Sequence, residues 1–219
     1  ADAKRMAEVM ADGVAKVLDY AVHTHGIASL AVSGGRSPIP FFEALSRREL
    51  DWSRVQITLA DERWVPPSDE ASNEALVRRY LLQGPAAQAQ FLGLYSPADT
   101  LAEAARHAAE ALTGLAQPID VLVLGMGEDG HTASLFPDSR ELELGLTTDA
   151  PVLATRTPSQ PQARITLSAD RLHQARRHVL HITGDDKRSV LARALSGDDS
   201  RELPIRAFLS CPLAVYWAP

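Results

Sequence analysis

The sequence predicts a layered α/β fold built around a largely parallel β-sheet. Short apolar runs alternate with stretches of helical spacing, a pattern typical of parallel strands joined by helices. Several of these runs end directly in glycine-rich or charged turns. The clearest example lies within Asp120 to Pro137, DVLVLGMGEDGHTASLFP, whose apolar part suits a strand buried on both faces. Ligands of such sheets bind beyond the carboxyl ends of the strands, so we expect the chemistry at this turn.

The first unit of the chain is expected to be a helix, a strand and a second helix. Apolar residues at helical spacing predict the first helix, which Gly26 can end: Met6, Val9, Met10, Val14, Val17, Leu18 and Ala21. A strand is expected over Ile27 to Val32, followed by the turn SGGRSP. The next helix runs through Phe41, Phe42 and Leu45, with Ser37 as its N-cap and Pro38 as its first residue.

The second unit repeats this order. A strand is expected over Val55 to Ala60, then a polar turn over Asp61 to Pro67, then a helix over Leu76 to Leu82 that Ser72 can cap. The alanine-rich segment Ala98 to Leu115 is expected to be helical and leads to the strand described first.

The rest of the chain completes the sheet. Further strands are expected over five segments: Val152 to Thr155, Arg164 to Leu167, Val179 to Thr183, Phe208 to Leu209 and Leu213 to Trp217. A helix is expected over Lys187 to Leu195. No long linker or internal repeat interrupts the pattern, so we expect residues 1–219 to form one Rossmann-like domain.

Composition and charge restrict the classes of function. Of the residues, 45% are hydrophobic and 23% charged, as in ordinary globular proteins. The formal net charge of −6 argues against nucleic acid or an anionic membrane as a partner. Cys211 is the only cysteine, and the N-terminal segment is charged throughout, unlike a secretory signal. We therefore expect a cytoplasmic protein, acting as a monomer on a small molecule.

Gly125 to Gly130, GMGEDG, matches the letters of a dinucleotide-binding fingerprint and follows a strand. That fingerprint needs a long helix opening at its third glycine and an acidic residue about 20 residues further on. Here Pro137 follows too soon for such a helix, and Asp149 lies in the turn-like TTDAP. We reject a nicotinamide site. The remaining alternatives are a purely structural glycine turn and a turn that presents His131.

A second glycine turn is a candidate anion site. Its five residues stand where a strand meets a helix, so their backbone N–H groups can approach a phosphate: Ser33, Gly34, Gly35, Arg36 and Ser37. The turn lacks the lysine of a nucleotide-binding G-x-x-x-x-G-K-[ST] loop, which argues against a nucleoside triphosphate. A capped structural turn is the plainer interpretation of these residues alone.

Other polar clusters argue only weakly for a metal. Four acidic residues surround two prolines and are typical of a solvated loop: Asp61, Glu62, Asp69 and Glu70. Asp61 differs because it directly follows an apolar strand. His178 and His181 are expected on opposite faces of one strand, which does not suit a shared ligand set. We expect no metal and no cofactor.

Taken together, these motifs resemble the family that contains 6-phosphogluconolactonases and glucosamine-6-phosphate deaminases. The resemblance covers nearly the whole chain and rests on five segments in the order of the family: SGGRSP, DERWVPPSDEASN, GMGEDGHTASLFP, RITLS with Arg164, and GDDK with Lys187. The deaminases continue after the histidine toward an Asn-Glu-Pro, whereas this chain has Leu135-Phe136-Pro137. The missing acid favours the lactonase branch. Many relatives also carry Ser-Thr where this chain has Arg36-Ser37, so Arg36 either strengthens phosphate binding or points to solvent.

The resemblance implies hydrolysis of 6-phospho-D-glucono-1,5-lactone to 6-phosphogluconate. It implies that Arg164 and Lys187 bind the phosphate together with the turn Ser33 to Ser37. His131 is the candidate general base, since an imidazole is largely neutral at cytosolic pH. Asp61 is expected either to orient His131 or to bind sugar hydroxyls. The developing oxyanion has two candidate donors, Arg63 and the backbone N–H groups of the glycine turn around Gly127.

Three alternatives stay open. A covalent route through Ser33 or Ser134 is disfavoured, because neither serine has a visible activating arrangement. A deaminase would release ammonia from glucosamine 6-phosphate. A non-catalytic sugar-phosphate sensor would keep the phosphate-binding residues and have no need of His131.

Overall fold

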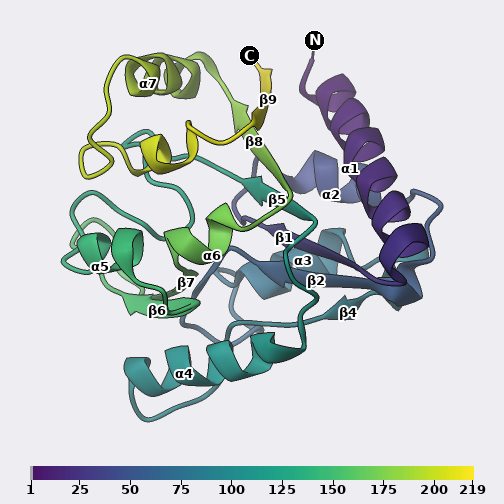
Figure 1. The fold of residues 1–219 in the computed structure, drawn as a ribbon, viewed down its shortest axis with the longest axis horizontal. Coiled ribbons are helices and arrows are strands. Elements are labelled where there is room, and N and C mark those ends of the chain that lie inside the picture. The colour runs from purple at the N-terminus through teal and green to yellow at the C-terminus, as the bar shows by residue number, and fades with distance from the viewer. Residues whose placement is uncertain (1) are drawn as a thin grey trace.

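Two β-sheets of different kinds organise the computed structural model, which describes residues 2–219 (Figure 1). The larger sheet has six strands, all parallel, in the order β4-β2-β1-β5-β8-β9. In chain order these are β1 Ala28–Val32, β2 Val55–Leu59, β4 Gln90–Phe91, β5 Val121–Leu124, β8 Arg177–Thr183 and β9 Leu213–Ala218. The smaller sheet is antiparallel in the order β3-β7-β6, with β3 Asp61–Arg63, β6 Val152–Thr155 and β7 Arg164–Leu167.

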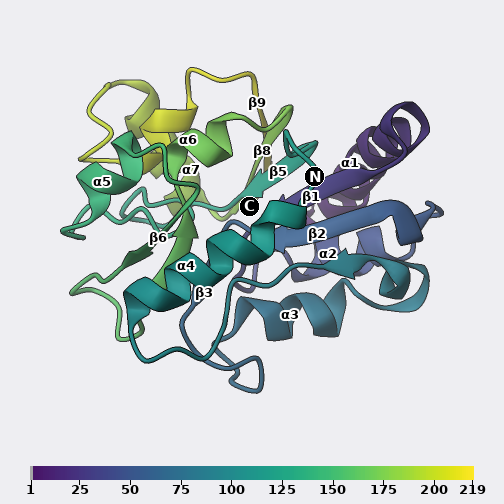
Figure 2. The same cartoon turned by 60° about the horizontal axis from the view of Figure 1, so that its bottom comes forward.

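Helices flank the sheets. They are α1 Ala3–His25, α2 Ile39–Ser46, α3 Asn73–Tyr80, α4 Leu101–Ala111, α5 Leu142–Thr147, α6 Ala169–His173 and α7 Asp185–Leu195. Helices α1 and α2 pack together beside the parallel sheet, where α1 contacts β1, β5 and β9. Helix α4 instead packs against β6 and β7 of the smaller sheet, as Figure 2 shows. None of the helices within residues 2–219 is both long and apolar enough to span a membrane.

Helix α1 shows how local sequence sets an element's limits. The Asp2 side chain accepts a hydrogen bond from the backbone N–H of Arg5 and so caps the first turn. At the other end Gly26 adopts a left-handed conformation, with φ of 79°, and its N–H donates to the carbonyl of Val22. Met10, Val14 and Leu18 are fully or almost fully buried, as the apolar spacing predicted.

One hydrophobic core joins the two sheets. The central strands β1, β2 and β5 are buried along their whole length, as expected for strands covered on both faces. Leu30 and Leu122 of the parallel sheet belong to the same buried cluster as Ile165 and Leu167 of the smaller one. The smaller sheet is therefore fixed against the larger, and side chains from both can form one site.

The predicted α/β fold with a largely parallel sheet is confirmed, and β6 and β7 have the predicted limits. Three local predictions were wrong. Phe208 lies in the 3₁₀ helix Pro204–Phe208, where it is buried in the core, and not in a strand. Ser37 does not cap α2, because Pro38 is the N-cap residue and the Ser37 hydroxyl lies 3.1 Å from the hydroxyl of Thr183. Asp61 to Arg63 form strand β3 and not a turn, because they pair with Arg164 to Thr166.

Glu62, in the middle of β3, holds the start of α3. Its fully buried carboxylate accepts hydrogen bonds from the backbone N–H groups of Arg63, Asn73 and Glu74 and from the Ser72 hydroxyl. Two of these donors belong to the first turn of α3, which also carries the positive end of the helix dipole. The predicted cap Ser72 is confirmed, since its hydroxyl accepts from the N–H of Ala75.

We expect Glu62→Gln to lower the free energy of unfolding by about 2 to 4 kcal/mol, because an amide nitrogen would replace one of two oxygens that face only donors. Urea unfolding at neutral pH measures the change. Glu70→Gln is the control, since Glu70 is exposed on the loop between β3 and α3 and should change stability by less than about 0.5 kcal/mol. Equal stabilities for both variants would contradict the capping role.

Candidate active site

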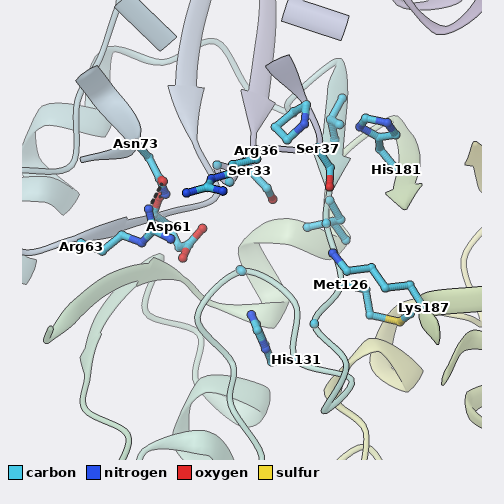
Figure 3. Close-up of a pocket in the computed structure, with 18 of the residues that line it drawn as sticks. Ser33, Arg36, Ser37, Asp61, Arg63, Asn73, Met126, His131, His181 and Lys187 are labelled. Atoms are coloured by element: carbon cyan, nitrogen blue, oxygen red, sulfur yellow. Dashed lines mark hydrogen bonds between the residues drawn. The ribbon is translucent and has the colours of Figure 1, made fainter. Parts of the chain in front are cut away.

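A cavity of about 200 Å³ lies at the carboxyl ends of the central parallel strands, where the sequence placed the chemistry. Its wall combines the turns after β1 and β5 with residues of β3, β7, β8 and α7. Figure 3 shows His131 facing the cavity from one side, with Asp61, Arg63 and Asn73 grouped on another. Every residue that the sequence analysis proposed for the site lines this cavity: Ser33, Gly34, Gly35, Arg36, Ser37, Asp61, Arg63, Gly127, His131, Arg164 and Lys187.

Two glycines in the turn after β1 serve different purposes. One allows an unusual backbone conformation, and the other leaves room for a neighbouring side chain. Gly35 has a φ of +95°, which favours glycine. Gly34 is required for another reason, because a Cβ there would lie 1.8 Å from the side-chain oxygen of Asn73. The same oxygen of Asn73 accepts a 2.8 Å hydrogen bond from Arg63, drawn as a dashed line in Figure 3. Gly34 thus makes room for the residue that holds the Arg63 guanidinium.

Four cationic side chains line the cavity, and they differ in burial and in their hydrogen-bond partners. Arg63 is tethered at one nitrogen by the carbonyl of Ala71 and the side chain of Asn73, each at 2.8 Å. Arg164 is 5% exposed and lies 3.8 Å from the carboxylate of Asp61. Lys187 is half-buried on α7, and Arg36 is exposed at the cavity rim.

The buried guanidinium of Arg164 has unused hydrogen-bonding capacity. One terminal nitrogen donates to Gln160 at 3.3 Å, while the buried Nε has no partner among residues 2–219. Burial lowers the pKa of Arg164, and the charge of Asp61 opposes this shift. Because the reference pKa is so high, the side chain stays cationic at neutral pH. A buried cation of this kind beside a cavity suits an anionic ligand.

The imidazole of His131 is oriented by a carboxylate two residues earlier. Its Nδ1 lies 2.5 Å from Oδ1 of Asp129, and the backbone N–H of His131 donates to the same oxygen at 3.1 Å. Burial raises the pKa of Asp129, but the hydrogen bonds and charge of His131 outweigh this, so the pKa lies below its usual value. Asp129 is therefore a carboxylate that fixes a proton on Nδ1 and leaves Nε2 as the basic nitrogen.

Two further contacts hold the turn that carries His131. The N–H of Gly127 donates to the carbonyl of His131 at 2.9 Å, and a Cβ on Gly127 would lie 2.2 Å from the Nδ1 of His131. Gly130 has a φ of +77°, and its carbonyl accepts from the N–H of Ile205 at 2.9 Å. Gly127 therefore serves the site by leaving room for the imidazole, since its N–H is already used.

Asp61 does not orient His131, which corrects one of the two expected roles. Its carboxylate accepts a 2.5 Å hydrogen bond from the buried hydroxyl of Ser134 and faces Arg164. The other expected role, a contact to sugar hydroxyls, stays a prediction. Ser134 donates to an acid and not to a histidine, and the buried hydroxyl of Ser33 has no partner within the described chain. Neither arrangement activates a serine nucleophile.

Sequence reasoning missed three residues of the site: Asn73, Asp129 and His181. The spacing Asp-Gly-His was the available signal for Asp129. His181 lines the cavity, whereas His178 contacts the carbonyl of Leu172, so the prediction that they face opposite sides of β8 is confirmed. Burial lowers the pKa of His181 to about 4, and the charge of Lys187 adds to the effect, so its imidazole is neutral.

Two of the four acidic residues considered for a metal accept hydrogen bonds from backbone N–H groups. Glu62 caps α3, and the Oδ1 of Asp69 accepts from the N–H of Ala71 at 2.8 Å. Within residues 2–219 the structure shows no cluster of three or more His, Cys, Asp or Glu side chains arranged to hold a metal ion.

The rim of the parallel sheet thus brings together a histidine–aspartate pair, the buried guanidinium of Arg164 and the half-buried Lys187, an arrangement that suits an enzyme acting on an anionic substrate. The model of the family described as glucosamine-6-phosphate isomerases/6-phosphogluconolactonase matches residues 1–217, and the chain belongs to this family.

Its relatives point to one branch. A 6-phosphogluconolactonase of Pseudomonas putida is 50% identical over 224 residues, covering 100% of this chain and 91% of its own. The crystal structure of a 6-phosphogluconolactonase from Shewanella baltica is 46% identical, with a TM-score of 0.98 over 100% of this chain and 96% of that one. A structure from Neisseria gonorrhoeae, described as a putative 6-phosphogluconolactonase, is 39% identical, with a TM-score of 0.91 over 100% and 97% of the two chains.

Proposed function

We propose that this chain hydrolyses 6-phospho-D-glucono-1,5-lactone to 6-phosphogluconate in the oxidative pentose phosphate pathway, with His131 as general base. The observation that carries the proposal is the pairing of His131 with Asp129 at a cavity that Arg164 and Lys187 also line. A ring ester with an anionic tail needs both a base for water and a cationic grip on the phosphate. The likeness to 6-phosphogluconolactonases over the full chain supports this substrate.

The proposed reaction begins with water held by Nε2 of His131. As the water oxygen bonds to C1 of the lactone, its proton passes to Nε2, and the carbonyl oxygen takes the negative charge. Collapse of this tetrahedral intermediate breaks the bond between C1 and the ring oxygen, and Nε2 returns the proton to that oxygen. Asp129 stabilises the imidazolium in between. No cofactor enters this scheme.

Arg63 is the proposed partner of the oxyanion. The N–H groups of Gly127 and Gly130 are engaged by the carbonyls of His131 and Gly127, so they are not available to the substrate. Arg63 keeps donors beyond the nitrogen that Ala71 and Asn73 hold, and it lines the cavity. A guanidinium fixed in place before the reaction stabilises developing charge at little reorganisation cost.

The phosphate is proposed to lie among Arg164, Lys187 and the turn Ser33 to Ser37. Arg164 offers a buried Nε without a partner in residues 2–219, and Ser33 offers a buried hydroxyl in the same condition. Both groups line the cavity, and an anion with several acceptor oxygens would satisfy them.

We further propose that residues 1–219 act as one domain, as a monomer, in the cytoplasm and without nucleic-acid or membrane partners. The shared core of the two sheets and the net charge of −6 support this proposal. Light scattering coupled to size exclusion tests the oligomeric state, since it should give the mass of a single chain.

The activity itself is tested with lactone generated enzymatically in the cuvette and a coupled 6-phosphogluconate dehydrogenase. We expect NADPH formation to exceed the spontaneous rate in proportion to added protein. The same preparation should release no ammonia from glucosamine 6-phosphate. Binding of 6-phosphogluconate without faster lactone loss would instead favour the sensor, and ammonia release would favour the deaminase.

A further inference from the structure

Phe136 is a buried aromatic residue that does not belong to the main hydrophobic cluster. Its side chain is 1% exposed, and it is one of the largest fully buried residues of the chain. The continuous hydrophobic cluster formed within residues 2–219 includes its neighbour Leu135 but not Phe136 itself. Phe136 is therefore fully buried without being one of the residues of that cluster.

Its partners are two of the polar groups proposed for the reaction. The ring of Phe136 stacks on the imidazole of His131, with centroids 4.2 Å apart and planes inclined by 28°. The Cζ of Arg164 lies over the same phenyl ring, 5.5 Å from its centroid. One apolar side chain thus contacts both the proposed base and the proposed phosphate ligand.

The backbone around Phe136 fixes the ring between these groups. The N–H of Leu135 donates to the carbonyl of Thr132, and the carbonyl of Phe136 accepts from the N–H of Ser139. The N–H of Ser134 donates to the hydroxyl of Thr166, which belongs to the same strand as Arg164. The segment that follows His131 is therefore fastened to β7, and Phe136 spans the space between imidazole and guanidinium.

We propose that Phe136 is a positioning residue that sets the plane of the His131 imidazole and the place of the Arg164 guanidinium relative to each other. The proposal rests on the roles given above to His131 and Arg164. The hydrogen bond to Asp129 fixes the direction of Nδ1 but leaves the ring free to rock about that direction, and stacking on Phe136 removes this freedom. The guanidinium over the same ring is held by cation–π attraction.

The test compares Phe136→Leu, which removes the ring, with Phe136→Tyr, which keeps it. Phe42→Leu is the matched control, because Phe42 is fully buried in the core on α2 and does not line the cavity. For Phe136→Leu we expect kcat on the phosphorylated lactone to fall by about 10- to 100-fold, as a small misplacement of the base does. KM should rise for the phosphorylated lactone but not for unphosphorylated gluconolactone.

The two other variants separate positioning from simple stability. Phe136→Tyr should keep kcat within about 3-fold of wild type, because its ring still stacks on the imidazole. Phe42→Leu should lower the melting temperature about as much as Phe136→Leu and leave kcat and KM unchanged. If Phe136→Leu does not fold, Phe136→Met replaces it, and failure of both to fold would assign Phe136 a purely structural role and overturn the proposal.

Further outcomes would also overturn it. These are a wild-type kcat in folded Phe136→Leu, equal kcat losses in Phe136→Leu and Phe136→Tyr, or a kcat loss in Phe42→Leu as large as that in Phe136→Leu. The proposed function fails separately, if wild-type protein does not hydrolyse the lactone or if His131→Ala keeps full activity. An active wild type with an inactive His131→Ala and an unaffected Phe136→Leu would reject the positioning role alone.

Discussion

Replacing His131 with alanine is expected to lower kcat for lactone hydrolysis by about 10²- to 10⁴-fold, the range that general base catalysis supplies. The imidazole that Asp129 orients is lost, while the cations that line the cavity stay in place. KM should therefore change by less than about 3-fold. Initial rates of acid release, corrected for spontaneous hydrolysis of the lactone, measure the effect.

Two companion variants sharpen this result. Asp129→Asn should lower kcat in the same direction, because its amide can present a hydrogen to Nδ1 and so favour the tautomer that lacks a basic Nε2. His23→Ala is the control, since His23 is an exposed residue of α1 that contacts Asp19. Wild-type turnover in His131→Ala would exclude His131 as the base and reopen the covalent alternative.

The second large effect is expected at the phosphate. Arg164→Ala should raise KM for the phosphorylated lactone by about 100-fold, since a charge-assisted contact from a buried guanidinium is lost. KM for unphosphorylated gluconolactone should change by less than about 3-fold, because that substrate has no anionic group for Arg164 to bind. Steady-state kinetics on both lactones, with each variant, measures the difference.

Stability must be followed in the same experiment, because Arg164→Ala leaves the buried carboxylate of Asp61 without its nearby cation. Arg164→Lys keeps the charge and should lie between wild type and Arg164→Ala in KM.

Arg36→Ala addresses the question left open for the exposed arginine at the rim. A KM increase confined to the phosphorylated lactone would assign Arg36 to phosphate binding, and no change would place it in solvent. Equal KM increases on both lactones in Arg164→Ala would contradict the phosphate role.

The centre of the parallel sheet could be predicted because β1, β2 and β5 are buried on both faces and end in distinctive turns, whereas the two-residue edge strand β4 was not predicted. In the antiparallel sheet, β6 and β7 were predicted as strands but β3 could not be, since it consists of Asp61, Glu62 and Arg63. These residues have low strand propensity, and their extended conformation comes from pairing with β7, far along the chain. Each polar side chain there has a particular partner: Ser134 for Asp61, the start of α3 for Glu62, and Asn73 for Arg63.

For the site, the sequence likewise predicted which residues lie near one another but not all of the contacts between them. The sequence predicted which residues gather at the strand ends, because parallel strands bring their turns to one edge. It offered Asp61 as the only carboxylate that could contact His131 and missed Asp129, which makes that contact. That contact depends on the conformation of residues 127–131, where Gly127 and Gly130 bend the chain so that Asp129 meets the ring. His181 was missed because alternation along β8 fixes opposite faces but not which face meets the cavity.

The link between Gly130 and Ile205 bears on when the protein becomes active during its own synthesis. Every residue proposed to bind or react, from Ser33 to Lys187, leaves the ribosome before Ile205, whose N–H holds the carbonyl of Gly130. Leu203 packs where a side chain on Gly130 would lie, so this late segment also closes over the turn. A nascent chain that already contains every residue proposed to bind or react still lacks the hydrogen bond from Ile205 that holds the turn carrying His131. We therefore expect turnover to begin only after the segment around Ile205 has left the ribosome and packed against the turn that carries His131.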